Sequence, residues 1–305
     1  MSRVSLRLPA TSANLGPGFD TLALALQMFL QIEAEAAEGF RLEATGRNAD
    51  LSGRAENNLL IETYRNLLAE EARPFVPLRI RMRNEIPLGM GCGSSAAARL
   101  AAVALASYFG ELRWTRERIL AEACRLEGHP DNAAACWLGG FVASAQDGER
   151  VQAISFALPP EWRAVLVMPD HPLATTESRA VLPDAYARRD VVANLQHVAL
   201  LTAAFASGRA DVIADAMHDW LHQPYRAKVC ALLPNLLPLA GQDGVAGVAL
   251  SGAGPAVLLL TTSETAAAGL IGRIQRATED AGRVEIVICR LESEPARFES
   301  AESHR

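Results

Sequence analysis

The segment IPLGMGCGSSAAARLAA, residues 86–102, combines three glycines and two serines at the start of an alanine-rich stretch of helical composition. The preceding residues 77–83, PLRIRMR, alternate apolar and basic side chains as a half-exposed strand does. Glycines at 89, 91 and 93 permit positive φ angles and let other atoms come close to the backbone. A strand, a bare turn and a helix N-terminus together present unpaired N–H groups and the positive end of a helix dipole to an anion. The segment therefore predicts a phosphate-binding loop.

This loop differs from the common nucleotide fingerprints. It lacks the lysine of a Walker A loop, and its Gly-x-Gly-x-Gly spacing is not Gly-x-Gly-x-x-Gly. Ser94 and Ser95 can cap the following helix or offer a hydroxyl to Mg²⁺. For the segment alone, a serine-capped helix entry without a ligand is the alternative interpretation.

Composition narrows the class of protein. The chain has 305 residues, half of them hydrophobic, which is enough for a sizeable core in one large domain or two smaller ones. A net charge of -6 without a dense Lys/Arg run argues against a nucleic-acid partner. The N-terminal residues do not read as a signal peptide, and no apolar run approaches the roughly 20 residues of a membrane span. We therefore expect a cytoplasmic protein without a membrane partner.

The five cysteines are odd in number and widely spread, with no pair at metal-knuckle spacing. We expect them to be reduced, and four of them to be small core residues. Cys92 lies inside the glycine turn, but no histidine follows locally to activate it as a nucleophile. A packing role is therefore favoured for Cys92 as well.

Strands and helices mix along the chain without regular alternation, which favours an α+β fold. The expected strands are residues 4–8, the later part of 21–36, 77–83, 151–158, 163–169, two strands about a glycine turn within 245–262, and 284–290. The expected helices are residues 57–72, 94–109, 115–126, 190–207 and 264–281. Residues 9–20 are expected to form a loop and 127–132 a polar turn. A change in pattern near residue 150 predicts two domains, 1–150 and 151–305.

Three motifs carry a resemblance to a known superfamily. The segment PLGMGCGSSAA, residues 87–97, is similar to the phosphate loop of the GHMP kinases, which phosphorylate small metabolites such as galactose, homoserine and mevalonate. LPATSANLGPGFDTLALAL, residues 8–26, and GVALSGAGPAVLLL, residues 247–260, resemble the first and third motifs of that superfamily. The resemblance implies a two-domain fold, with an ATP-binding N-terminal domain like ribosomal protein S5 domain 2 and a ferredoxin-like C-terminal domain.

Two positions depart from the superfamily pattern. Cys92 stands where the loop usually has leucine, a change of one apolar residue for a smaller one that should be tolerated. Ala256 stands where the third motif usually has serine, which puts any role of that hydroxyl in doubt here.

Within the superfamily, the sequence resembles the branch that acts on L-homoserine. The resemblance is carried by SANLGPGFD (12–20), EGHPDNAA (127–134), ATTESRAVLP (174–183) and LHQPYR (221–226). It implies transfer of the γ-phosphoryl group of ATP to the hydroxyl of L-homoserine, giving O-phospho-L-homoserine in threonine biosynthesis. It also implies a homodimer.

Homoserine carries a carboxylate, an ammonium and a primary hydroxyl, so its site needs donors for the first and acceptors for the second. Arg179 and Arg226 suit the carboxylate because guanidinium forks bind carboxylates bidentately. The resemblance implies the remaining substrate contacts, which are Asn14 and Asp20 near the ammonium, His129 and Asp131 near the hydroxyl, and Thr175 as a further polar contact.

The nucleotide is expected on the glycine loop. Its expected contacts are Pro87, Gly89, Gly91, Gly93, Ser94, Ser95 and Ala96, with the adenine near Asn57 and Asn58. Mg²⁺ prefers oxygen ligands and keeps several waters, so Ser95 with Glu127 would suffice, and Glu122 is the competing carboxylate. Ser95, Glu127 and Asp131 are the expected catalytic residues, and whether Asp131 acts as a general base stays open.

Two other interpretations stay open at this point. The chain could be a GHMP kinase for another carboxylate-bearing alcohol, such as mevalonate or shikimate, or a non-catalytic relative that binds a metabolite. The remaining histidines match no motif and are expected on the surface or in the core: His171, His197, His218 and His222.

Overall fold

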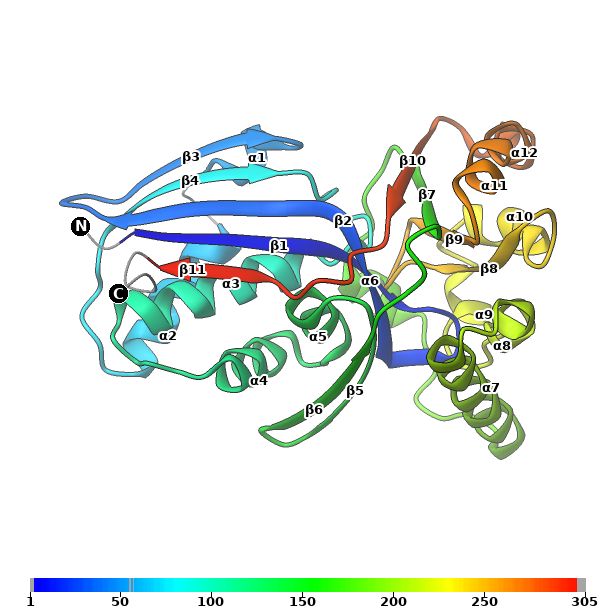
Figure 1. Cartoon of the computed structure of the whole chain (residues 1–305), viewed down its shortest axis with the longest axis horizontal. Helices are drawn as coiled ribbons and strands as arrows, with labels where there is room; N and C mark the ends of the chain where they lie inside the picture. The colour runs from blue at the N-terminus through cyan, green and yellow to red at the C-terminus, as the bar shows by residue number, and fades with distance from the viewer. Residues whose placement is uncertain (1–2, 55, 57, 301–305) are drawn as a thin grey trace.

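The computed structural model describes residues 3–54, 56 and 58–300, which form two β-sheets with helices packed against them (Figure 1). The first sheet has seven strands, in the order β11-β1-β2-β4-β3, and β5 joins it by pairing with β2 and β6. Its strands are β1 (Arg3–Asn14), β2 (Gly18–Ala36), β3 (Arg41–Gly46), β4 (Leu78–Asn84), β5 (Phe141–Asp147), β6 (Arg150–Phe156) and β11 (Arg297–Ser300).

β1 and β2 form a long antiparallel hairpin at the centre of this sheet. The prediction of a loop over residues 9–20 is wrong, because β1 continues to Asn14 and β2 begins at Gly18. Residues 8–14 are buried on both faces, so the alternation that marks a half-exposed strand is missing from their sequence. A register shift between Pro9 and Ala10 accommodates the proline within the ladder.

Helices pack on one face of the first sheet (Figure 1). They are α1 (Ala49–Ser52), α2 (Leu59–Glu70), α3 (Ser94–Phe109), α4 (Arg116–Glu127) and α5 (Asp131–Leu138). The helices predicted at 94–109 and 115–126 are confirmed, and the second is capped by the Thr115 hydroxyl. α3 is lined with fully buried alanines, which let it lie close to β1 and β2. The predicted polar turn at 127–132 is shorter than expected, because Asp131 already begins α5.

The second sheet has the strand order β10-β7-β9-β8, and each neighbouring pair is antiparallel. Its strands are β7 (Arg163–Pro169), β8 (Val245–Leu250), β9 (Val257–Thr261) and β10 (Val284–Arg290). Helices connect β7 to β8 and β9 to β10, which is the ferredoxin-like β-α-β-β-α-β arrangement. The predicted pair of strands within 245–262 is confirmed.

The connecting helices include α7, which confirms the helix predicted near residues 190–207. The helix predicted at 264–281 is broken at Leu270 and at Thr278 into three short pieces. The bounds are α6 (Thr175–Ala180), α7 (Arg188–Ser207), η1 (Ala210–Val212), α8 (Ile213–Ala216), α9 (Gln223–Arg226), α10 (Leu232–Leu236), η2 (Leu237–Leu239), α11 (Glu264–Gly269), α12 (Ile271–Ala277) and η3 (Glu279–Ala281).

The core continues from one sheet into the other. In β7, Leu166 and Met168 belong to the large cluster shared with the first sheet, while Val165 and Val167 pack in a second cluster with α10 and α12. β7 is therefore buried on both faces. β6 and β11 lie in the first sheet although both come from the second half of the chain, and a division at residue 150 stays a prediction.

No helix within the described ranges has both the length and the apolar character needed to cross a membrane.

Candidate active site

The predicted site residues gather in one cleft with a volume of about 660 Å³. Its lining includes residues from the phosphate loop, the turn before α5, the start of α6 and the third motif. Of the predicted residues it contains Asn14, Asp20, Gly89, Gly91, Gly93, Ser94, Ser95, Ala96, Glu127, His129, Asp131, Thr175, Arg179 and Arg226. Pro87 and Asn58 do not line it, and Asn57 lies outside the described residues.

Hydrogen bonds join the three motifs to one another around the cleft. The Thr11 N–H donates to the Cys92 carbonyl at 3.1 Å, and the Gly252 N–H donates to the Ala13 carbonyl at 3.0 Å. The buried Ser251 hydroxyl donates to the Gly91 carbonyl at 2.8 Å. The shape of the phosphate loop therefore depends on strands of both sheets.

Two glycines of the loop admit no side chain. Gly91 and Gly93 have φ angles of 74° and 70°. A Cβ atom on Gly91 would lie 2.1 Å from the Ser251 carbonyl oxygen, and one on Gly93 would lie 1.9 Å from Thr11 Oγ1. Gly93 precedes α3, whose first turn receives no cap from a side chain in the described part of the chain. The loop therefore presents backbone N–H groups at a helix N-terminus, as an anion site requires.

Cys92 is buried, and burial raises the pKa of its thiol to about 12. A thiol held neutral in this way is a poor nucleophile, so the expected packing role fits its surroundings.

Ser95 and Glu127 lie in direct contact. The Ser95 hydroxyl donates to Glu127 Oε1 at 2.7 Å, and Arg99 Nη1 donates to the same oxygen at 2.7 Å. A hydroxyl and a carboxylate side by side are hard oxygen donors of the kind that Mg²⁺ takes, so these residues fit that ion. Glu122, the competing carboxylate, is buried and bound to Arg125, away from the cleft.

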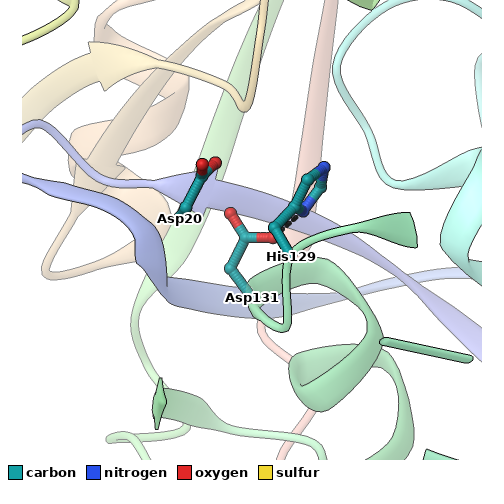
Figure 2. A group of neighbouring side chains, drawn as sticks. All are labelled: Asp20, His129 and Asp131. Carbon is teal, nitrogen blue, oxygen red and sulfur yellow. Dashed lines mark hydrogen bonds and ion pairs between the residues drawn. The ribbon is translucent and has the colours of Figure 1, made fainter. Parts of the chain in front are cut away.

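Asp20, His129 and Asp131 form a compact group in the cleft (Figure 2). Each offers one ligand atom, and these atoms all lie within 4.8 Å of one another. Nδ1 of His129 lies 2.8 Å from Asp131 Oδ1, which also accepts from the Asn132 N–H at 2.6 Å. Burial lowers the pKa of His129. The hydrogen bond with Asp131 and the negative charge of that carboxylate raise the pKa by more than burial lowers it, so the net shift is upward. An imidazole and two carboxylates suit an ammonium, a hydroxyl or a divalent cation.

Two arginines reach the other side of this group. Arg179 Nη2 lies 2.6 Å from Asp20 Oδ1. Arg226 is fully buried and donates to the carbonyls of Ser178 and Gly252, each at 3.3 Å. Burial and the neighbouring positive charge of Arg179 lower the pKa of Arg226. Arg226 is therefore not a solvated surface charge.

Both arginines lie over the ring of Phe19. The guanidinium carbons of Arg179 and Arg226 are 5.4 Å and 5.2 Å from the ring centroid. One aromatic ring thus contacts both cations, at distances where cation–π attraction is felt.

Asn14 holds the first motif in place. It adopts a left-handed conformation, donates through Nδ2 to the Gly252 carbonyl at 2.7 Å, and accepts the Asp20 N–H through Oδ1 at 3.0 Å. Its amide therefore fixes the backbone that carries Asp20. Thr175 is the first residue of α6 and is exposed at the rim of the cleft.

Asn58 lines a second pocket, of about 450 Å³, which shares Ser94 and Ser95 with the cleft. Its side chain caps α2, because Oδ1 accepts from the Leu60 and Ile61 N–H groups. Apolar residues form much of this pocket, including Leu51, Leu59, Ile86 and Leu88. Pro87 is buried just before the loop.

Two residues of this region were missed by the sequence analysis. Arg99 belongs to none of the motifs named for the site, although its position five residues after Ser94 places it in the first turns of α3. His222 was expected on the surface or in the core, and it is fully buried with Nδ1 at 3.2 Å from Arg226 Nη1. The i, i+4 spacing of His222 and Arg226 is the signal that could have revealed this pair.

The two-sheet α+β fold and a bare phosphate loop beside a charged cleft are those of a GHMP kinase. The family model described as the GHMP kinases N terminal domain matches residues 58–140, and the GHMP kinases C terminal model matches residues 201–280. The predicted fold class is confirmed, and kinases of this superfamily use ATP.

Within that superfamily the chain belongs to the homoserine kinases. It is 44% identical to the homoserine kinase of Solibacter usitatus over 83% of this chain and 84% of that protein. It is 40% identical to the homoserine kinase of Moorella thermoacetica over 83% of this chain and 86% of that protein. The crystal structure of homoserine kinase from Cytophaga hutchinsonii has the same fold, with a TM-score of 0.82, 23% identity and 97% of each chain covered.

Proposed function

We propose that this chain transfers the γ-phosphoryl group of ATP to the hydroxyl of L-homoserine. The observation that carries the proposal is the charge arrangement of the cleft, in which Asp20 pairs with Arg179, and Asp131 and Arg226 line the same cleft beside the phosphate loop. This set matches the two charges of an amino-acid zwitterion. Names of the relatives support the same substrate.

Each group of homoserine has a proposed partner in the cleft. Arg226 and Arg179 bind the carboxylate, because both are cations and both lie against the ring of Phe19. Asp20 binds the ammonium, and Asn14 fixes the backbone from which Asp20 projects. Thr175 adds a polar contact at the rim.

The hydroxyl of homoserine lies near His129 and Asp131 in this proposal. The described hydrogen bonds of Asp131 go to Oδ1, and Figure 2 shows its other oxygen turned toward Asp20. Asp131 therefore accepts a hydrogen bond from the hydroxyl and orients it for attack on the γ-phosphate. His129 keeps the Asp131 carboxylate in that orientation.

ATP binds with its phosphates on the loop from Gly89 to Ala96 and with its adenine in the second pocket beside Asn58. The loop N–H groups and the N-terminus of α3 offset negative charge on the phosphates. Ser95 and Glu127 are the proposed Mg²⁺ ligands, and the ion, when bound, neutralises charge on the phosphates. Arg99 adds a fixed positive charge beside Glu127.

Two further features belong to the proposal. We expect a homodimer, as the resemblance implies, which light scattering of the purified protein would test. We also expect a cytoplasmic location, and the five buried free thiols suit a reducing compartment.

The deciding experiment is Mg²⁺-dependent ADP release in a coupled assay. L-homoserine, L-serine, D-homoserine, mevalonate, shikimate and galactose are offered separately. Release with L-homoserine alone supports the proposal. Release with mevalonate or shikimate instead would assign the cleft to another carboxylate-bearing alcohol, and no release with any acceptor would favour a non-catalytic metabolite-binding protein.

A further inference from the structure

The ring of His222 is fully buried behind the cleft, and both of its nitrogens have partners. Nε2 lies 2.8 Å from the Gly16 carbonyl oxygen, and Nδ1 lies 3.2 Å from Arg226 Nη1. The ring stacks on Phe19, with centroids 5.3 Å apart. His222 is not part of the cleft lining, so it has no direct access to a substrate.

These contacts select one form of the imidazole. A guanidinium can only donate hydrogen bonds, so Nδ1 must carry a lone pair. A carbonyl oxygen can only accept, so Nε2 must carry the hydrogen. Only the neutral ring with its hydrogen on Nε2 satisfies both contacts with Gly16 and Arg226.

Charged groups around the ring are Asp219 from the segment before α9, Arg226 from α9, and Asp20 from β2. Asp219 Oδ2 lies 3.4 Å from Nε2 and accepts the backbone N–H groups of His222 and Gln223 at 3.0 Å and 2.6 Å. Burial and the Arg226 charge outweigh the two carboxylates and lower the pKa of His222. The neutral form is therefore the stable one near pH 7.

The other two hydrogen bonds of Arg226 go to backbone carbonyls. Its Nε and Nη1 reach the carbonyls of Ser178 and Gly252 at 3.3 Å each, and the contact with His222 is on the same Nη1. His222 Nδ1, at 3.2 Å, is the one side-chain acceptor that the described structure gives this guanidinium, and His222 itself does not line the cleft.

We propose that His222 is a positioning residue for substrate recognition: it accepts from Arg226 Nη1 and so fixes the guanidinium in the orientation that meets the carboxylate of an amino-acid substrate. The proposal rests on the function proposed above. It assigns His222 an effect on the binding of the acceptor and none on the nucleotide.

Two substitutions test the roles of the two ring nitrogens of His222 separately. In His222→Asn the side-chain oxygen can take the place of Nδ1 and accept from Arg226. In His222→Gln the amide can take the place of Nε2 and donate to Gly16, while the acceptor for Arg226 is lost. His218→Gln is the control, because His218 is a histidine outside the cleft that contacts only the Asp215 carbonyl and neighbouring rings in the described structure.

We expect His222→Gln to raise the KM for L-homoserine about ten- to hundredfold, the range for a hydrogen bond to a charged group. The KM for ATP should change less than about threefold, and His222→Asn should stay within about fivefold of wild type in both constants. Equal effects of the two substitutions, a larger effect of Asn than of Gln, or an equal rise in both KM values would overturn the proposal.

A second measurement uses the wild-type protein and does not depend on how the variants fold. Long-range ¹H–¹⁵N NMR reports which nitrogen of His222 carries the hydrogen. We expect a neutral ring with its hydrogen on Nε2 from pH 7 to 8.5, and a hydrogen on Nδ1 would refute the contact with Arg226. If the wild type fails to release ADP with L-homoserine, the proposed function fails, and the NMR result still decides the state of the ring.

Discussion

Arg179 and Asp20 bind each other across the cleft, with Nη2 of the arginine 2.6 Å from Oδ1 of the aspartate. One is the proposed partner of the substrate carboxylate and the other of the substrate ammonium. A zwitterion that enters between them supplies each with a new partner of opposite charge. A neutral alcohol would separate the two charges and replace neither, which disfavours its binding.

Replacement of Arg179 tests the proposed carboxylate contact. We expect Arg179→Ala to lower kcat/KM for L-homoserine by about 2 to 4 kcal/mol, because a charge-assisted contact is lost and Asp20 is left unpaired. The KM for ATP should be nearly unchanged in steady-state kinetics. Arg189→Ala, at an exposed arginine outside the cleft, is the control. A loss below tenfold would remove Arg179 from the substrate site.

Glu127 and Glu122 lie on the same helix and provide a matched pair. We expect Glu127→Gln to lower kcat by about 100-fold or more and to raise the Mg²⁺ concentration needed for half-maximal rate, because a metal-binding carboxylate is lost. Glu122→Gln should keep kcat within a few fold, since Glu122 binds Arg125 away from the cleft. The reverse order in a Mg²⁺ titration would assign the metal to Glu122.

Gly93 and Gly208 have almost the same backbone conformation, with φ angles of 70° and 69°, but different surroundings. A Cβ atom on Gly93 would meet Thr11 Oγ1, whereas nothing lies within 4 Å of one on Gly208. We expect Gly208→Ala to lower the free energy of unfolding by about 1 kcal/mol through backbone strain alone. Gly93→Ala should lose more stability and also weaken ATP binding, as measured by urea unfolding and calorimetry. If both variants lose the same unfolding free energy and Gly93→Ala binds ATP as wild type does, the structure around Gly93 accommodates the added methyl group and the prediction is wrong.

The contact between His129 and Asp131 should make stability depend on pH. The pKa of His129 is raised above its ordinary value of about 6.5, so the folded state binds this proton more readily than the unfolded state. The stabilisation is complete below about pH 6.5 and is lost as pH rises through the folded-state pKa. We expect the difference in unfolding free energy between wild type and His129→Gln to be larger at pH 6 than at pH 8.5 in urea titrations. If the difference in unfolding free energy does not depend on pH, the pKa of His129 is not raised in the folded state and the prediction is wrong.

The local signals of the phosphate loop predicted its helix well. α3 occupies residues 94–109 as expected, because the glycines before it and the alanine run within it act over short distances. The first motif was read as a loop for the opposite reason. Its residues from Ala10 to Asn14 gain their order from pairing with β2 and from burial on both faces, which leave no alternation in the sequence.

The residues of the site could be predicted from the sequence more readily than the contacts between them. Motif resemblance led to Asp20, Asp131 and Arg226, which the fold brings into one cleft. The contacts of Arg99 with Glu127 and of His222 with Arg226 are found only once the helices are placed, although the spacing of His222 and Arg226 is a signal for the second pair. The break of the predicted helix at Leu270 lies next to Gly269, a residue of low helix propensity that the periodicity of the segment does not report.

Residues 297–300 of β11 pair with residues 4–7 of β1, so one edge of the first sheet is covered by a segment made after every strand of the second sheet. During translation, β1 leaves the ribosome before its partner on that side exists. Until β11 arrives, the N–H and C=O groups along that edge can accept a strand from another nascent chain. β11, which is made late in synthesis, therefore protects the edge of β1 against pairing with another chain.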